Sequence, residues 1–184
     1  MWNLTTGNEA ACRADLHVHS CCSDGLKTPE QLCAIAGRLL DKGLDGERII
    51  DDSFFKKSYV QNQIMGRALL ESILFMDGKC IFTVVKARDM EFYGVDSKDL
   101  DGIVDQLRVT DGVECAIFIY ESGVQQYKVS LRANGDLNVA KVASYFGGGG
   151  HVRAAGFSAV GDINEIYHTA EALIKEQLDT CTME

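Results

Sequence analysis

Four consecutive glycines followed by a histidine, at residues 147–151, form the segment of this 184-residue sequence that most directly suggests chemistry. Glycine lets a backbone approach a ligand closely, and loop amides together with an imidazole can bind an anion. The run follows an expected helix, whereas the glycines of a Walker loop or a dinucleotide fingerprint precede one. A binding loop is therefore one interpretation, and a helix C-cap followed by a flexible link is the alternative.

An alternating segment at residues 124–132 adds polar groups to this candidate site. If it is a strand, Lys128, Ser130 and Arg132 share one face. A hydroxyl and a planar guanidinium on one face can hold the same phosphate, and the alternative is the solvent face of an edge strand. The expected substrate-binding residues are Ser130, Arg132, Gly147, Gly148, Gly149, Gly150, His151 and Arg153.

The charge distribution supports a small anionic ligand over a long nucleic acid. The chain carries 27 acidic and 18 basic residues, a net charge of -9, which excludes a generic polycation for duplex DNA. Segment 125–156 reverses this balance with four bases and one acid, a local charge of +3. Such a segment can focus a positive field on a cleft, although chance clustering on a solvated face is an equal alternative.

A second group of candidate residues lies near the N-terminus. If residues 15–19 form a strand, Asp15, His17 and His19 point to one face. Two imidazoles and a carboxylate can chelate a divalent metal, manganese or zinc. A His-x-His pair alone is more often structural or superficial, so this edge is an alternative site.

The elements that must position these residues alternate between helix and strand. Capping signals, apolar periodicity and turn residues predict helices at 28–43, 46–52, 57–76, 88–93, 100–108, 138–146 and 163–178, and strands at 80–86, 113–120, 124–132 and 155–159. This alternation predicts an α/β fold, a mixed β-sheet flanked by helices, with a helical lead-in and a short N-terminal extension.

Composition places the chain among globular proteins. Hydrophobic residues make up 46% of it, enough for one full core. We expect neither a membrane-spanning segment nor a secretion signal. Seven cysteines without any Cys-x-x-Cys suggest thiols in a reducing, cytoplasmic location. A homo-oligomer is left open.

At residues 127–157 the sequence resembles a known family. Tyr-Lys-Val-Ser-Leu-Arg at 127–132, Val-Ala-Lys-Val-Ala at 139–143 and Phe-Gly-Gly-Gly-Gly-His-Val-Arg-Ala-Ala-Gly-Phe at 146–157 are similar to the DHH-associated C-terminal domain. That domain occurs in DHH-family phosphoesterases, especially short-oligonucleotide exonucleases that also act on 3'-phosphoadenosine 5'-phosphate. The resemblance covers about residues 39–178 and implies a substrate-binding domain, 39–184, in which Arg132, Gly148, Gly149, Gly150 and His151 contact the ligand, with Ser130 as a candidate.

The catalytic half expected of that family is not recognisable in the sequence. Its manganese ions sit in an N-terminal domain with an Asp-His-His string, which does not occur here, so a separate catalytic DHH domain is an implied partner. Instead, Asp-Leu-His-Val-His-Ser and Ser-Asp-Gly, within residues 14–36, resemble the opening motif of the PHP phosphoesterases. Residues 1–38 are therefore interpreted as an incomplete PHP-like segment.

Three hypotheses follow. The first is a binding module that holds a nucleotide or short single-stranded oligonucleotide without complete hydrolytic machinery. The second is a metal-dependent phosphoesterase in which Asp15, His17 and His19 hold the metal. The third is a structural or interaction role with both motifs vestigial.

Overall fold

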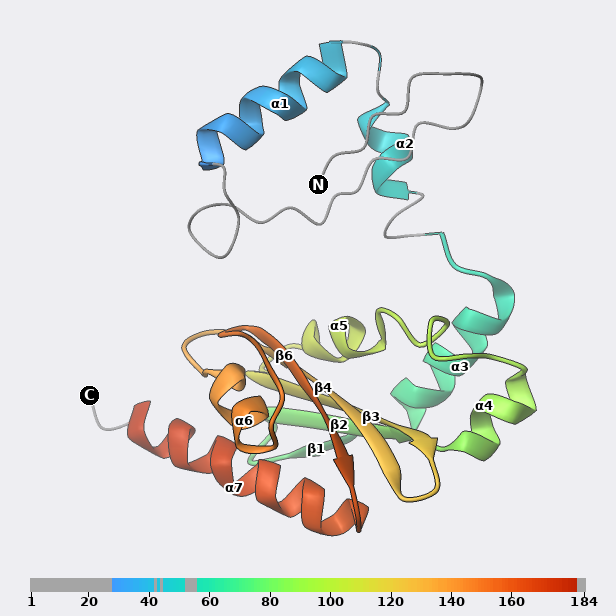
Figure 1. Ribbon diagram of the computed structural model, residues 1–184, viewed down its shortest axis with the longest axis vertical. Helices are drawn as coiled ribbons and strands as arrows, with labels where there is room; N and C mark the ends of the chain where they lie inside the picture. The colour runs from blue at the N-terminus through green and yellow to red at the C-terminus, as the bar shows by residue number, and fades with distance from the viewer. Residues whose placement is uncertain (1–27, 42, 44, 52–55, 182–184) are drawn as a thin grey trace. The chain divides into compact units, whose positions relative to one another are not determined.

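The computed structural model describes residues 28–41, 43, 45–51 and 56–181 (Figure 1). The chain divides into two units, Met1–Lys57 and Ser58–Glu184. In the first unit, the described helices are α1 (Pro29–Asp41) and α2 (Gly46–Ile50). Thr28 caps α1 as predicted, since its Oγ1 accepts a hydrogen bond from the Gln31 N–H at 3.3 Å and Gln31 Oε1 accepts one from the Thr28 N–H at 3.0 Å. The strand expected at residues 15–19, with Asp15, His17 and His19, lies outside the described residues.

The second unit is built on a mixed six-stranded sheet. Its elements are α3 (Tyr59–Leu70), β1 (Ile73–Phe75), β2 (Cys80–Val85), α4 (Ala87–Tyr93), α5 (Ile103–Arg108), β3 (Cys115–Gly123), β4 (Gln126–Ala133), α6 (Val139–Tyr145), β5 (Gly149–His151), β6 (Ala154–Val160) and α7 (Ile163–Cys181). The strand order is β1-β2-β3-β4-β6-β5. Only β2 and β3 are parallel, and α4 and α5 lie in the connection between them. The predicted α/β class with a mixed sheet flanked by helices is confirmed.

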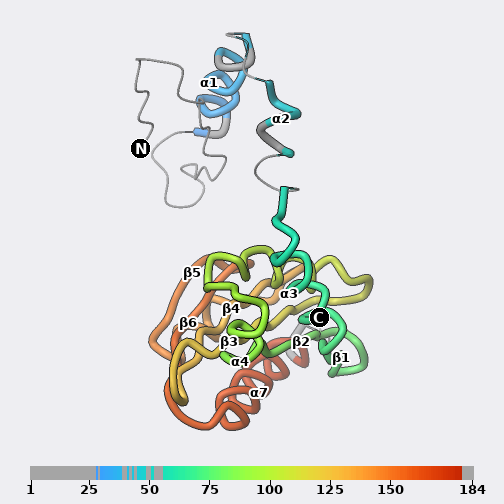
Figure 2. Tube along the Cα trace, turned by 90° about the vertical axis from the view of Figure 1, so that its right-hand side faces the viewer, coloured from blue at the N-terminus to red at the C-terminus, as the bar shows by residue number. Residues whose placement is uncertain are grey.

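Helices cover both faces of this sheet. On one face, α6 and α7 pack against a buried cluster that includes Ile117, Leu131 and Ile174. On the other face, α3 and α5 pack against a second cluster that includes Ile81 and Phe118. In Figures 1 and 2, α7 accordingly runs along the side of the sheet opposite to α3.

The helix predicted at residues 57–76 is wrong over its last six residues, 71–76. The structure ends α3 at Leu70 and forms β1 at Ile73–Phe75, which pairs with β2 in antiparallel register. A left-handed turn then follows, with φ of 50° at Met76 and 53° at Asp77. A short apolar run fits a helical face and a strand equally well, and here pairing with the edge of the sheet decides the outcome.

The face that carries α3 and α5 is only partly covered. Along β4 the side chains alternate between buried residues (Tyr127, Val129, Leu131, Ala133) and more exposed ones (Gln126, Lys128, Ser130, Arg132). The buried set belongs to the cluster under α6 and α7. The exposed set therefore points to the other face, where β4 and β6 extend past the helical cover and leave part of the sheet open.

Among the described residues, no helix is both long enough and apolar enough to cross a bilayer.

Candidate functional site

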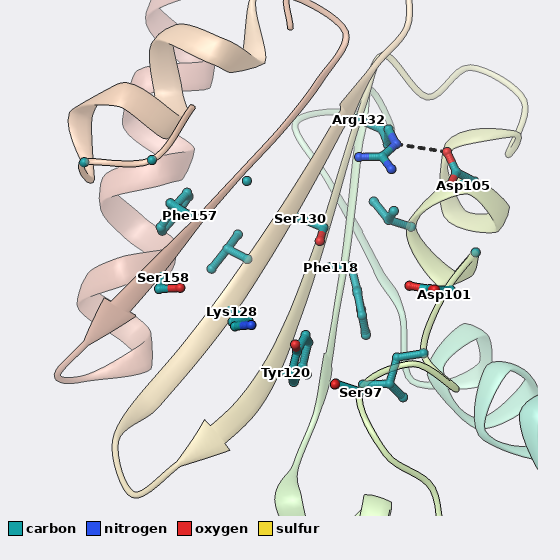
Figure 3. A pocket seen from close by; sticks show the side chains of 17 residues that line it. Ser97, Asp101, Asp105, Phe118, Tyr120, Lys128, Ser130, Arg132, Phe157 and Ser158 are labelled. Atoms are coloured by element: carbon teal, nitrogen blue, oxygen red, sulfur yellow. Dashed lines mark hydrogen bonds and ion pairs between the residues drawn. The ribbon is translucent and has the colours of Figure 1, made fainter. Parts of the chain in front are cut away.

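The uncovered part of the sheet forms one wall of a pocket of about 750 Å³, a size typical of small-molecule sites. The facing wall is α5 with the segment that leads into it, and the first glycines after α6 close one side (Figure 3). The lining residues are Ser97, Leu100, Asp101, Gly102, Val104, Asp105, Phe118, Tyr120, Lys128, Val129, Ser130, Arg132, Gly147, Gly148, Gly156, Phe157 and Ser158.

The register of the sheet arranges the pocket floor in three rows. Tyr120 pairs with Lys128, and Lys128 with Ser158. Phe118, Ser130 and Gly156 form the next row. Ala116, Arg132 and Ala154 form the third, from which Arg132 reaches the pocket lining. Residues directly opposite each other share a face of the sheet. The prediction that Lys128, Ser130 and Arg132 lie on one face is thereby confirmed, and Figure 3 shows these three side chains along β4.

An ion pair crosses the pocket at the Arg132 end. Arg132 Nε donates to Asp105 Oδ1 at 3.0 Å, and Arg132 Nη1 donates to the carbonyl of Leu131 at 3.2 Å. Arg108 Nε lies 3.8 Å from the same Asp105 oxygen. A guanidinium has five N–H donors, so these contacts fix the side chain and leave donors for a ligand.

This acidic wall changes the electrostatics expected from the sequence. Two of the bases in segment 125–156, Lys128 and Arg132, line the pocket, but so do Asp101 and Asp105. The formal charges of these four side chains cancel. The local excess of +3 therefore does not describe the pocket, because Asp105 of α5 and Asp101 of the segment before it lie opposite β4.

The first two glycines of the run cap α6. The Gly147 N–H donates to the carbonyl of Ser144 at 3.0 Å and the Gly148 N–H to that of Ala143 at 2.9 Å. Gly147 has a φ of +75°, as expected after a helix that ends in this motif. These two amides are therefore used inside the fold, and the helix-cap alternative accounts for this half of the run.

The second half of the run is a strand. The sequence predicts a loop at Gly149–His151, whereas the structure pairs these residues with β6 as the edge strand β5. A Cβ on Gly150 would lie 2.5 Å from the carbonyl oxygen of Ala154, and one on Gly148 would lie 2.5 Å from the Cβ of Phe157. The fold thus requires glycine at positions 148 and 150. A Cβ on Gly149 would meet no atom within 4 Å.

The structure brings some of the predicted site residues together and leaves others at the margin. Ser130, Arg132, Gly147 and Gly148 line the pocket, whereas Gly149, Gly150, His151 and Arg153 do not. His151 pairs with Ala154, which pairs with Arg132. His151 is therefore two strands, roughly 10 Å, from Arg132. Arg153 lies in the turn between β5 and β6, and its carbonyl accepts the N–H of Ala133 at 2.9 Å.

The sequence analysis did not identify the pocket residues of the facing wall, nor Tyr120 on β3. Asp101 and Asp105 carry no local signal, because their relation to Arg132 exists only in the folded chain. Tyr120 ends the strand predicted at 113–120, and it is half-buried and lines the pocket. The alternation of β4, by contrast, was sufficient to identify Lys128 as a neighbour of Ser130.

The metal site expected from the sequence is not tested by the described residues. Within the described residues, no three His, Cys, Asp or Glu side chains gather closely enough to hold a metal ion. Asp15, His17 and His19 lie outside those residues, so the metal site and the PHP-like segment remain predictions.

Comparison with known proteins agrees with the resemblance drawn from residues 127–157. The DHHA1 domain model matches residues 77–176. The bifunctional oligoribonuclease and PAP phosphatase NrnA of Thermus thermophilus is 32% identical over 155 residues, which are 82% of this chain and 44% of that protein. The chain thus spans less than half the length of this curated relative.

A solved structure gives independent support for the fold. An exopolyphosphatase-related protein from Bacteroides fragilis superposes with a TM-score of 0.71 at 23% identity, covering 79% of this chain and 43% of that one. With more than half of the sequence matched by the domain model, this chain belongs to the DHHA1 domain family.

Proposed function

We propose that this chain is the nucleotide-binding domain of a DHH-type phosphoesterase, and that its pocket holds a nucleotide or a short single-stranded oligonucleotide. The observation that carries the proposal is the β4 floor, where Ser130 and Arg132 share one face of a pocket of about 750 Å³. A guanidinium fixed by Asp105 offers a planar set of N–H donors to a phosphate. Membership of the DHHA1 family and the activities named for NrnA support the choice of ligand.

The glycine run contributes in two ways in this proposal. Gly147 and Gly148 bring backbone to the pocket wall without side chains. Gly149 stands in β5 with open space where a Cβ would be, so a ligand can lie directly against the backbone there. His151 and Arg153 follow at the margin and are proposed to contact the parts of an oligonucleotide that extend beyond the pocket.

Hydrolysis is proposed to need a catalytic DHH domain that supplies manganese. The sequence contains no Asp-His-His string, which is the feature that identifies such a domain. We further infer a cytoplasmic location, supported by Cys80 and Cys115, which are buried free thiols on neighbouring strands.

Binding of a fluorescently labelled tri-adenylate RNA, followed by anisotropy at low salt, tests the proposal. Wild-type chain is expected to bind, Arg132→Ala to bind at least about tenfold more weakly because a charge-assisted hydrogen bond is lost, and Arg132→Lys to retain part of the affinity. Arg88→Ala, an equal charge change on an exposed α4 residue outside the pocket, is the control. Unchanged binding in Arg132→Ala would refute this function.

The second candidate function is a metal-dependent phosphoesterase. It is favoured by the spacing of Asp15, His17 and His19, which suits metal chelation. In that case purified chain with added manganese releases mononucleotide from the same RNA, and metal content falls in His17→Ala and His19→Ala. If wild-type chain neither retains metal nor releases mononucleotide, this alternative is eliminated.

A further inference from the structure

Two cysteines lie side by side in the interior of the sheet. Cys80 begins β2 and Cys115 begins β3, and the two residues are in register on these parallel strands. Both are free thiols with 0% exposure, and both belong to the buried cluster under α6 and α7. Neighbouring strands lie about 4.8 Å apart, so two side chains in register on one face come into contact. Hydrogen bonding to Cys80, and then burial, accordingly raise the pKa of the Cys115 thiol.

A third sulfur atom lies next to this pair. Met76 directly follows β1 and packs against the same buried cluster, and its Sδ accepts a hydrogen bond from Cys80 Sγ at 3.7 Å. Because metal–sulfur bonds are about 2.3 Å long, two sulfur ligands of one ion lie about 3.8–4.0 Å apart at tetrahedral or trigonal angles. The separation of Cys80 Sγ and Met76 Sδ is thus close to the spacing of two ligands of one metal ion.

The donors gathered here are sulfur atoms alone. In register, Cys80 lies between Phe75 on β1 and Cys115 on β3, and the ring of Phe75 packs against those of Phe82 and Tyr167. Among the described residues, no three His, Cys, Asp or Glu side chains gather to complete a zinc tetrahedron, and calcium and magnesium need oxygen ligands. Two thiols and a thioether instead form a soft donor set, which selects Cu(I).

A second cavity gives access to the thioether. It has a volume of about 560 Å³ and lies between the turn after β1 and the α7 residues from His168 to Asp179. Met76 is part of its lining, whereas Cys80 and Cys115 are not. An ion that enters this cavity therefore meets the sulfur of Met76 before it reaches the two thiols.

We propose that Cys80, Cys115 and Met76 form a binding site for one Cu(I) ion. The site does not rest on the proposed function, because α7 covers it on the face of the sheet opposite to the nucleotide pocket. Binding releases the two thiol protons to solvent, and copper keeps its oxidation state. The buried thiols lose these protons because a thiol that coordinates a metal is deprotonated outright.

Anaerobic titration of the full chain with Cu(I), in competition with the chromogenic chelator bicinchoninate, tests the site. The chain has five further cysteines, at 12, 21, 22, 33 and 181, so a variant with serine at these five positions isolates the pair. This five-serine chain is expected to take one Cu(I) per chain from the chelator. It should also unfold at a higher temperature with Cu(I) than without it, because the site exists only in the folded state.

Replacing the thioether tests the third ligand without removing a thiol. Met76→Leu in the five-serine chain conserves size, so the fold should be retained, and Cu(I) affinity should fall by at least the roughly tenfold that even an outer-sphere partner contributes. Met90→Leu is the matched control, because Met90 packs against the cluster on the other face of the sheet. X-ray absorption at the copper edge is expected to show sulfur neighbours only.

A folded five-serine chain that retains no copper would overturn the proposal. Nitrogen or oxygen neighbours in place of sulfur, or equal effects of Met76→Leu and Met90→Leu, would also overturn it, because the ion would then lie elsewhere. The wild-type chain provides a second measurement that does not depend on the folding of the five-serine chain. There, Cys80→Ala combined with Cys115→Ala should lower the retained copper by one ion per chain, and an unchanged copper content would exclude the site.

Discussion

Arg132 Nε lies 3.0 Å from Asp105 Oδ1, and this contact joins the pocket floor on β4 to the facing wall on α5. Asp105 is also 3.8 Å from Arg108 Nε, so one carboxylate lies between two guanidinium groups. The contact has two opposite effects on an anionic ligand. It holds the guanidinium of Arg132 in place, and it sets a negative charge beside the position that a phosphate would occupy.

Substituting Asp105 separates these effects. Asp105→Asn keeps an oxygen that can accept from Arg132 Nε but removes the charge, so we expect tri-adenylate to bind about threefold more tightly at low salt. Asp105→Ala removes the acceptor as well and frees the Arg132 side chain, so binding should be weaker than in Asp105→Asn. Anisotropy titrations at two salt concentrations measure both. Tighter binding in Asp105→Ala than in Asp105→Asn would show that Arg132 is not held in place by this contact.

Gly149 and Gly150 are adjacent, yet only one of them is required by the fold. Gly150 has a φ of 144° and its Cβ would meet the backbone of Ala154 and Ala155. Gly150→Ala should therefore lower the free energy of unfolding by at least about 1–3 kcal/mol, the usual cost of a strained backbone position, because the added clash comes on top of it. Gly149→Ala should change it by no more than about 0.5 kcal/mol, because open space surrounds the new methyl group.

Although Gly149→Ala should hardly affect stability, we expect it to weaken ligand binding. If a nucleotide lies against the β5 backbone, the methyl group of Gly149→Ala occupies ligand space, and affinity falls although the protein remains folded. Urea denaturation and tri-adenylate titration of the same preparation measure both quantities. Wild-type affinity in a stable Gly149→Ala chain would place the ligand away from β5.

Local pattern predicted the parts of the fold whose side chains alternate regularly. The two-residue period at 124–132 identified β4 and grouped Lys128, Ser130 and Arg132 correctly. It could not decide on Ile73–Phe75, because three apolar residues after a helix fit either structure, and pairing with β2 is a tertiary event. Periodicity therefore predicts an element only where the periodic segment is long enough to distinguish a strand from a helix.

The candidate site was only half visible in the sequence for a related reason. The predicted part of its floor lies on β4, whereas the facing wall comes from α5 and the segment before it, and Asp105 is 27 residues away from Arg132. A charge count over a sequence window cannot detect such a pair. The glycine run, by contrast, is conspicuous in the sequence, but most of it serves the fold. The backbone requires glycine at 147, 148 and 150, and it does not require glycine at 149.

Thr83 provides a test of how α3 is held on the sheet. Its Oγ1 donates to the carbonyl of Ala68 at 2.8 Å, and the residue is 1% exposed. Ala68 lies in the last turn of α3, where carbonyls lack helical partners. Thr83→Val keeps the shape but leaves this buried carbonyl without its donor, which should lower the free energy of unfolding by about 1–3 kcal/mol.

Thr169 offers a matched control for this substitution. Its Oγ1 donates to the carbonyl of Glu165 at 2.7 Å within α7, but the bond is exposed to solvent. Thr169→Val should change the free energy of unfolding by less than about 0.5 kcal/mol in the same urea titration. Equal losses in the two variants would mean that burial of the Thr83 bond has no special effect.

Tyr167 should give the protein a distinctive alkaline titration. Its ring packs against Phe82, with centroids 4.5 Å apart, and against Phe75 at 5.7 Å. Burial, followed by the charge of Glu171, raises the pKa of Tyr167 from 10.0 to about 12. Because the folded state disfavours the phenolate, the resulting stability is fully present below pH 10 and is lost as the pH rises from about 10 to about 12.

The phenolate absorbance of wild type minus that of Tyr167→Phe isolates this group among the six tyrosines. The difference should rise near pH 12 in folded protein and near pH 10 in urea. Glu171→Gln should lower the folded midpoint only partway, because burial is the larger cause and remains after the charge is removed. A midpoint that returned fully to 10 in Glu171→Gln would assign the shift to the carboxylate instead, and Tyr167 would then be open to solvent despite its contact with Phe82.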